Sequence, residues 1–149
     1  MQIYKLYVAL DSGAVDHCVN PKDLPDSIMV VKEDEKRRFV NATGEDIDHY
    51  GNALVRLKKS DGRHVSSTFQ VMDVCRPLHS TSKICDQGCN VVYTDKEAVV
   101  IPSGLLEKFL ESVTRHATYP RVGGLYVAEL HVSTDPASAS PFGGQGQKQ

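Results

Sequence analysis

The residues with the clearest chemical potential are Asp11, Ser12, Gly13 and Ala14, which directly follow an apolar run over residues 8–10. An apolar strand that ends in an acid places the carboxylate at the rim of a core, where it can act as a general acid or base. Gly13 permits a sharp turn, and Ser12 can hydrogen-bond to nearby backbone and hold the loop in one shape. Asp-Ser-Gly is also an ordinary turn sequence, so its surroundings decide its meaning.

Length and charge limit the classes of function open to the chain. Its 149 residues suffice for one domain with a substantial core, and 17 basic against 19 acidic residues give a formal net charge of −2. This balance provides neither a basic footprint for nucleic acid nor an anchor for an anionic membrane. No apolar segment of the sequence reaches the roughly 20 residues that span a bilayer. We therefore expect a cytoplasmic protein that binds neither nucleic acid nor membrane.

The four cysteines, Cys18, Cys75, Cys85 and Cys89, are too few for a disulfide framework. We expect them to be buried free thiols. Cys85 and Cys89 have helical spacing, with His79 nearby in the sequence, but they lack the paired Cys-x-x-Cys knuckle that zinc sites use. A metal-binding module built on these three residues is one alternative, although we expect no metal and no cofactor.

The elements that would position Asp11 are predicted to be strands. Residues 3–10 change from alternating to continuously apolar, which predicts a strand that becomes buried as it approaches Asp11. Residues 14–19 predict a returning strand, with Asp16 and His17 as a surface pair. Residues 28–31 predict a further short strand, and the charged run that follows it is typical of a solvated loop without a chemical role.

Three hairpins are predicted in the middle of the chain. Residues 39–51 form the first, with Thr43, Gly44 and Glu45 at its tip, and this hairpin is a candidate for a mobile flap over a cleft. The second spans residues 54–74 around an Asp-Gly turn, and β-branched residues predict the third over residues 90–101. Adjacent hairpins of this kind indicate a mainly β, antiparallel domain.

The remaining segments predict two helices, a strand and a tail. Ser and Thr at an N-cap position and a following glycine predict a short helix over residues 81–87. An apolar stripe predicts an amphipathic helix after Pro102 that packs against the β domain. Residues 123–132 predict a last strand. The chain thus divides into a domain over residues 1–102, a helix-plus-strand extension over 103–132 and a disordered tail over 133–149.

Two blocks of the sequence resemble a known family. The segment from Leu10 to Ala14 resembles the active-site motif of retropepsin-like aspartic proteases of retroviral and retrotransposon polyproteins. Residues 68–88 are similar to a segment of the protease regions of copia-type retrotransposons, and the strand beginning at Gly123 is similar to the segment just downstream. The resemblance covers roughly residues 5–130 and implies a mainly β, retropepsin-like fold with a short helix near 81–87 and a C-terminal amphipathic helix.

The resemblance also implies an activity. Peptide hydrolysis by this family needs two carboxylates that share one proton. With a single Asp-Ser-Gly in the chain, it implies an aspartic endopeptidase that acts as a homodimer, with the catalytic Asp11 contributed by each copy. It further implies Ser12, Gly13 and Ala14 as the active-site loop and residues 43–45 as the flap. The substrate would be a peptide or the retrotransposon polyprotein, processed in the cytoplasm or within a retrotransposon particle.

Two other classes of function stay open beside the protease and the metal-binding module. His79 stands where copia-type chains commonly have leucine, which favours a catalytically inactive retropepsin-like remnant or a binding module. A β-rich interaction domain unrelated to proteases, in which Asp11 belongs to a plain turn, is the other.

Overall fold

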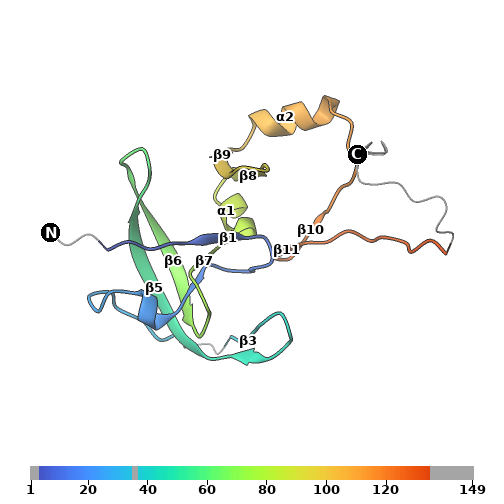
Figure 1. Cartoon of the computed structure of the whole chain (residues 1–149). Helices are drawn as coiled ribbons and strands as arrows, with labels where there is room; N and C mark the ends of the chain where they lie inside the picture. Colours follow the sequence, from blue (N-terminus) through green and yellow to red (C-terminus); the bar gives the residue numbers. More distant parts are fainter. Residues whose placement is uncertain (1–3, 35–36, 135–149) are drawn as a thin grey trace.

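A computed structural model describes residues 4–34 and 37–134 (Figure 1). This part of the chain is mainly β, with 36% strand and 13% helix. A five-stranded sheet in the order β1-β7-β2-β6-β5 forms its centre. The strands of this sheet are β1 (Ala9–Asp11), β2 (Cys18–Val19), β5 (His49–Lys58), β6 (His64–Met72) and β7 (Leu78–Ser80).

The central sheet is mixed, whereas the sequence patterns predicted an antiparallel one. β1 runs parallel to β7, with Asp11 opposite Ser80, and β2 runs parallel to β6. Alternation of apolar and polar residues is the same in both kinds of pairing, so it cannot report strand direction. The tight-turn hairpin β5–β6 is antiparallel, as its Asp-Gly turn requires.

The core lies on one face of the β5–β6 hairpin. Along β5, Ala53 and Val55 point inward while Leu54 between them is 65% exposed, because successive side chains of a strand point to opposite faces. The last four residues of β6 are all buried, so both faces of the strand are covered at this end. These strands share one apolar cluster with the segment after β2, formed by Val19, Leu24, Ala53, Val55, Phe69 and Val71.

Smaller elements surround this sheet, and several match the predicted ones. The predicted hairpins and the predicted short helix are present, the latter as α1. Outside the central sheet the elements are η1 (Pro21–Asp23), β3 (Phe39–Val40), β4 (Asp46–Ile47), α1 (Thr81–Asp86), β8 (Cys89–Tyr93), β9 (Ala98–Pro102), α2 (Leu105–Ser112), β10 (Arg121–Val122) and β11 (Leu125–Tyr126).

Four predicted strands are shorter than expected. The strand predicted over residues 3–10 is reduced to β1. The returning strand over 14–19 is reduced to β2. Residues 28–31 contribute one bridge, between Val31 and Asn52. The predicted strand over 123–132 is reduced to β11, which pairs with the two residues of β10. An alternating sequence thus indicates that a segment can form a strand. The strand forms only over those residues that lie beside another strand.

The prediction that α2 packs its apolar stripe against the β domain is wrong. Leu105 is 83% exposed and Phe109 60% exposed. Figure 1 shows α2 beyond β8 and β9, away from the five-stranded sheet. An amphipathic pattern predicts the helix but does not say which surface will cover its apolar face.

Two further expectations concern the ends of the chain and its surroundings. Most of the predicted disordered tail, over 133–149, lies outside the described residues. Within the described part of the chain, neither helix is long and apolar enough to cross a membrane.

Gly51 is a position where the fold requires glycine. Its φ is +140°, and a Cβ placed on it would lie 2.2 Å from the backbone oxygen of Val31, which pairs with Asn52. We predict that Gly51→Ala lowers the free energy of unfolding by about 2–4 kcal/mol, through backbone strain and loss of that pairing. Urea unfolding of both proteins measures the difference.

Gly62→Ala is the matched control for this prediction. Gly62 also has a positive φ, +87°, but open space surrounds its Cα. The control should lose about 1 kcal/mol. Equal losses in the two variants would contradict the steric explanation for Gly51.

Candidate active site around Asp11

Asp11 ends β1 and begins a tight loop, as its sequence predicts. Its Oδ1 accepts a hydrogen bond of 2.8 Å from the backbone N–H of Gly13, and the N–H of Ala14 donates to the Asp11 carbonyl oxygen at 3.4 Å. A Cβ on Gly13 would lie 3.2 Å from the carboxylate, so a side chain there would crowd it. Asp11 and Ala14 are half-buried, while Ser12 and Gly13 are exposed. The loop therefore presents a carboxylate, held by a backbone amide, at the surface of the core.

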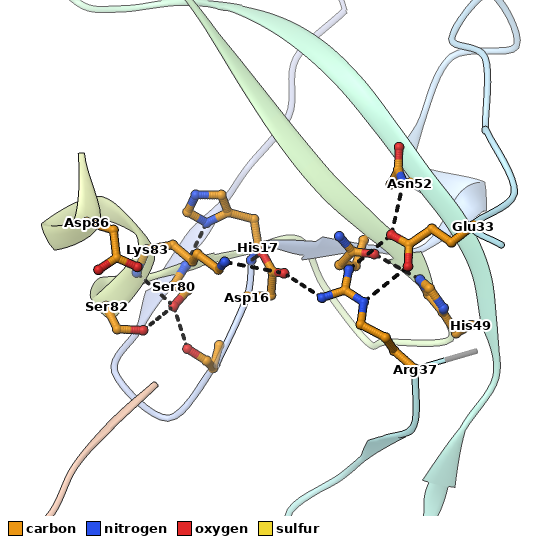
Figure 2. Close-up of polar contacts among 12 residues, drawn as sticks. Asp16, His17, Glu33, Arg37, His49, Asn52, Ser80, Ser82, Lys83 and Asp86 are labelled. Carbon is orange, nitrogen blue, oxygen red and sulfur yellow. Dashed lines mark hydrogen bonds and ion pairs between the residues drawn. The ribbon is translucent and has the colours of Figure 1, made fainter. Parts of the chain in front are cut away.

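Ser80 forms hydrogen bonds that hold this loop in place. Its side chain is fully buried, and its Oγ donates to the Ala14 carbonyl oxygen at 2.5 Å and accepts from the N–H of Lys83 at 3.3 Å, which caps α1 (Figure 2). The Ser80 N–H donates to His17 Nδ1 at 2.9 Å. One residue thus joins the start of α1 to both sides of the Asp11 loop. The sequence identified a helix start here but gave no sign of the contact with Ala14.

His17 and His79 pack together beneath the loop. Their ring centroids are 4.7 Å apart, and His79 stacks on Phe69 at 5.2 Å. Burial, assisted by the neighbouring His17, lowers the pKa of His79 to about 4. Burial also lowers the pKa of His17, against the opposing effect of Asp16. Both rings are therefore neutral near pH 7 and pack as uncharged aromatic groups against Phe69.

The prediction that Asp16 and His17 form a surface pair is wrong. The Asp16 side chain is 11% exposed, and its Oδ2 lies 3.4 Å from Arg37 Nη1 and 3.9 Å from Lys83 Nζ. The two cations come from the segment before β3 and from α1, so Asp16 links both of them to the loop that follows Asp11 (Figure 2).

The charged run before β3 has a structural role that its composition did not reveal. Arg37 donates two hydrogen bonds, of 3.1 and 3.0 Å, to the Glu33 carboxylate, which also accepts from Asn52 in β5. Hydrogen bonds from Arg37 and Asn52 lower the pKa of Glu33 to about 2. The predicted solvated loop is therefore tied to β5 at one end and to Asp16 at the other. A run of mixed charge gives no information about which of its members will find buried partners.

The predicted flap is the β3–β4 hairpin. Asn41 organises its tip, because its Oδ1 accepts from the N–H groups of Thr43 and Glu45, both at 3.0 Å, and from Thr43 Oγ1 at 2.7 Å. Gly44 has a φ of +84°, as expected for the turn residue. Asn41 was missed in the sequence, although Asn at the start of a turn commonly binds backbone amides in this way.

The hairpin and the Asp11 loop face one cleft of about 990 Å³. Asp11, Gly13 and Ala14 contribute to the wall from the loop, and Val40 and Glu45 contribute from the hairpin. Of the other predicted site residues, Ser12, Thr43 and Gly44 are exposed and do not line the cleft. The cleft therefore brings together Asp11, Gly13, Ala14 and Glu45, which the sequence separates by more than 30 positions.

The cysteines are free thiols, as predicted, but most of them are not buried. All four are free, but Cys18 alone is buried, Cys75 is exposed and the other two are half-buried. The described residues contain no group of three or more His, Cys, Asp or Glu side chains that could hold a metal ion. Cys85 instead accepts a hydrogen bond of 3.4 Å from the hydroxyl of Tyr126.

Comparison of the chain with protein-family models, characterised proteins and solved structures gives no significant match. The assignment of a function therefore depends on the geometry of the cleft and on the sequence motifs.

Removal of the Ser80 hydroxyl tests whether this residue stabilises the Asp11 loop. We predict that Ser80→Ala lowers the free energy of unfolding by about 1–3 kcal/mol, because the variant leaves the Ala14 carbonyl unpaired and removes the cap of α1. Urea unfolding provides the measurement. The exposed Ser103, replaced by Ala, is the control and should change stability by less than about 0.5 kcal/mol. A loss no larger than that of the control would refute the role.

His79 should make the fold sensitive to acid. The unfolded chain, with an ordinary pKa near 6.5, takes up a proton between pH 6.5 and 4 that folded His79 does not, so stability falls as the pH is lowered through this window. His79→Phe keeps the aromatic packing without the titration. We predict that its loss of stability from pH 7 to 4 is smaller than that of the wild type by about 2 kcal/mol, a value that allows for partial solvent access.

Urea unfolding at the two pH values measures this effect. Exposed His64, replaced by Gln, should retain the pH dependence of the wild type. If the His79→Phe variant loses as much stability as the wild type, another group is responsible for the acid sensitivity.

Proposed function

We propose that the chain is a retropepsin-like aspartic endopeptidase that hydrolyses peptide bonds as a homodimer. The observation that supports this proposal is the cleft that is lined both by the Asp11 loop and by the β3–β4 hairpin. A cleft of about 990 Å³ has the size of typical ligand sites. A carboxylate and a hairpin that line one cleft are two of the features that the resemblance to retropepsins implies.

Asp11 differs in its partners from Asp16 and Asp46, two other acids that line the cleft. Asp16 is paired with Arg37, and Asp46 lies 2.6 Å from Arg38. The Asp11 carboxylate accepts instead from a backbone amide of its own loop. A backbone amide keeps a carboxylate in position without neutralising its charge, which suits a group that must exchange a proton with water.

Hydrolysis then needs a second Asp11 from another copy, related by a two-fold axis. Two carboxylates about 3 Å apart hold one proton between them. The ionised member accepts a proton from the attacking water, while the protonated member donates to the oxygen of the scissile carbonyl. The backbone N–H of Gly13 would hold each carboxylate in place, and the hairpin would cover the bound peptide.

The biological role that we propose is processing of a copia-type retrotransposon polyprotein, in the cytoplasm or within the particle. The two sequence blocks around Asp11 and over residues 68–88 support it. In the fold these blocks contain β1 with its loop and β7 with α1, the segments that Ser80 joins.

The decisive variant is Asp11→Asn. It should reduce cleavage of a peptide substrate by at least about a thousandfold, because the amide cannot accept the proton from water. Cleavage by the wild type should be sensitive to pepstatin, and sedimentation should show a dimer. Asp95→Asn, at an exposed turn between β8 and β9, is the control and should keep full activity. Undiminished cleavage by Asp11→Asn would show that Asp11 is not the catalytic residue.

A monomer that binds peptides without cleaving them would identify a binding module in place of an enzyme. Isothermal titration of the wild type with the same peptides distinguishes this outcome from a complete absence of binding.

A further inference from the structure

The β10–β11 hairpin is attached to α1. Arg121 makes two hydrogen bonds to the Asp86 carboxylate, at 2.6 and 3.1 Å, and a third to the carbonyl oxygen of Gly123 at 2.7 Å. The hydroxyl of Tyr126 donates to Cys85 Sγ. Both ends of the hairpin thus bind α1, the helix whose N-cap residue, Ser80, hydrogen-bonds to the Asp11 loop.

The turn of this hairpin lies directly on the Asp11 loop. A Cβ on Gly124 would be 2.9 Å from Cβ and 3.0 Å from Cα of Val15, so glycine alone fits there without displacement. Figure 1 shows β11 beside the loop that follows β1. The next residue, Leu125, is 38% exposed and lines the same cleft as Asp11. The segment after α2 therefore returns to the cleft and adds an apolar side chain to its wall.

We propose that the β10–β11 hairpin is part of the peptide-binding site, in which Arg121 positions the hairpin and Leu125 selects apolar side chains of the bound peptide. This inference rests on the proposed function. An apolar wall favours an apolar ligand group, which it removes from water, and disfavours a charged group, which it desolvates without a partner. Arg121 and Gly124 are positioning residues, whereas Leu125 would contact the peptide.

Hydrogen exchange of the full-length chain tests the positioning step without any need for activity. The amides of Gly13 and Ala14 are hydrogen-bonded within the loop that leads into Val15, the residue against which the hairpin turn lies. Arg121→Gln and Gly124→Val, which release or displace the hairpin, should each raise exchange at these amides at least fivefold. Arg115→Gln, at an exposed position before the hairpin, is the control and should leave exchange unchanged. Unchanged exchange in both test variants would overturn the positioning role.

Cleavage of a peptide pool tests the selection step. The wild type should prefer an apolar residue at one substrate position, and Leu125→Lys should shift the preference there toward acidic residues at least tenfold. Leu130→Lys is the control, because Leu130 is 70% exposed and lies outside the cleft lining. A profile identical to that of the wild type would overturn the role of Leu125. Faster cleavage by Gly124→Val would also overturn it, since the hairpin would then obstruct the site.

The two experiments separate the failure of this inference from the failure of the proposed function. If the wild type neither cleaves nor binds any peptide of the pool, the proposed function fails and selection by Leu125 fails with it. Hydrogen exchange in that case still decides whether the hairpin positions the loop.

Discussion

The position of Asp11 depends on the hydrogen bond between the Ser80 hydroxyl and the Ala14 carbonyl oxygen, which joins two segments 66 residues apart. Parallel pairing of β1 with β7 brings these segments side by side and sets Asp11 opposite Ser80. Because Ser80 is fully buried, a loop that moved away would leave polar groups without partners in the core. The loop, the strand and the start of α1 are therefore held as one unit.

The two sides of the cleft differ in how firmly they are held. Partly buried hydrogen bonds and aromatic packing hold the Asp11 loop. The β3–β4 hairpin is held by the pairing of its own two-residue strands and by the contact of the Phe39 ring with His49, at a centroid distance of 4.9 Å. Because none of residues 39–47 is buried, the hairpin is the side with the lower cost of local opening. A firmly held carboxylate and a more easily displaced hairpin at one cleft suit the peptide site that we propose.

Much of the local structure could be predicted because its causes lie within a few residues. The Asp61-Gly62 turn, the Ser80 cap of α1 and the Gly44 tip each depend on neighbouring backbone geometry. The predictions that were wrong concern contacts between segments that are distant in the sequence. Asp16 was assigned to the surface because Arg37 and Lys83, its partners, are 21 and 67 positions away. The burial of a charged side chain depends on such partners.

The sequence by itself determined the Asp-Ser-Gly loop, the hairpins and both helices. These features follow from side-chain chemistry and periodicity along the chain. The tertiary structure alone decided that the central sheet is mixed, that α2 leaves its apolar face uncovered and that Leu125 returns to the cleft of Asp11. The physical reason is that strand direction, burial and the lining of a cleft depend on which remote segment packs alongside, and no local pattern records that choice.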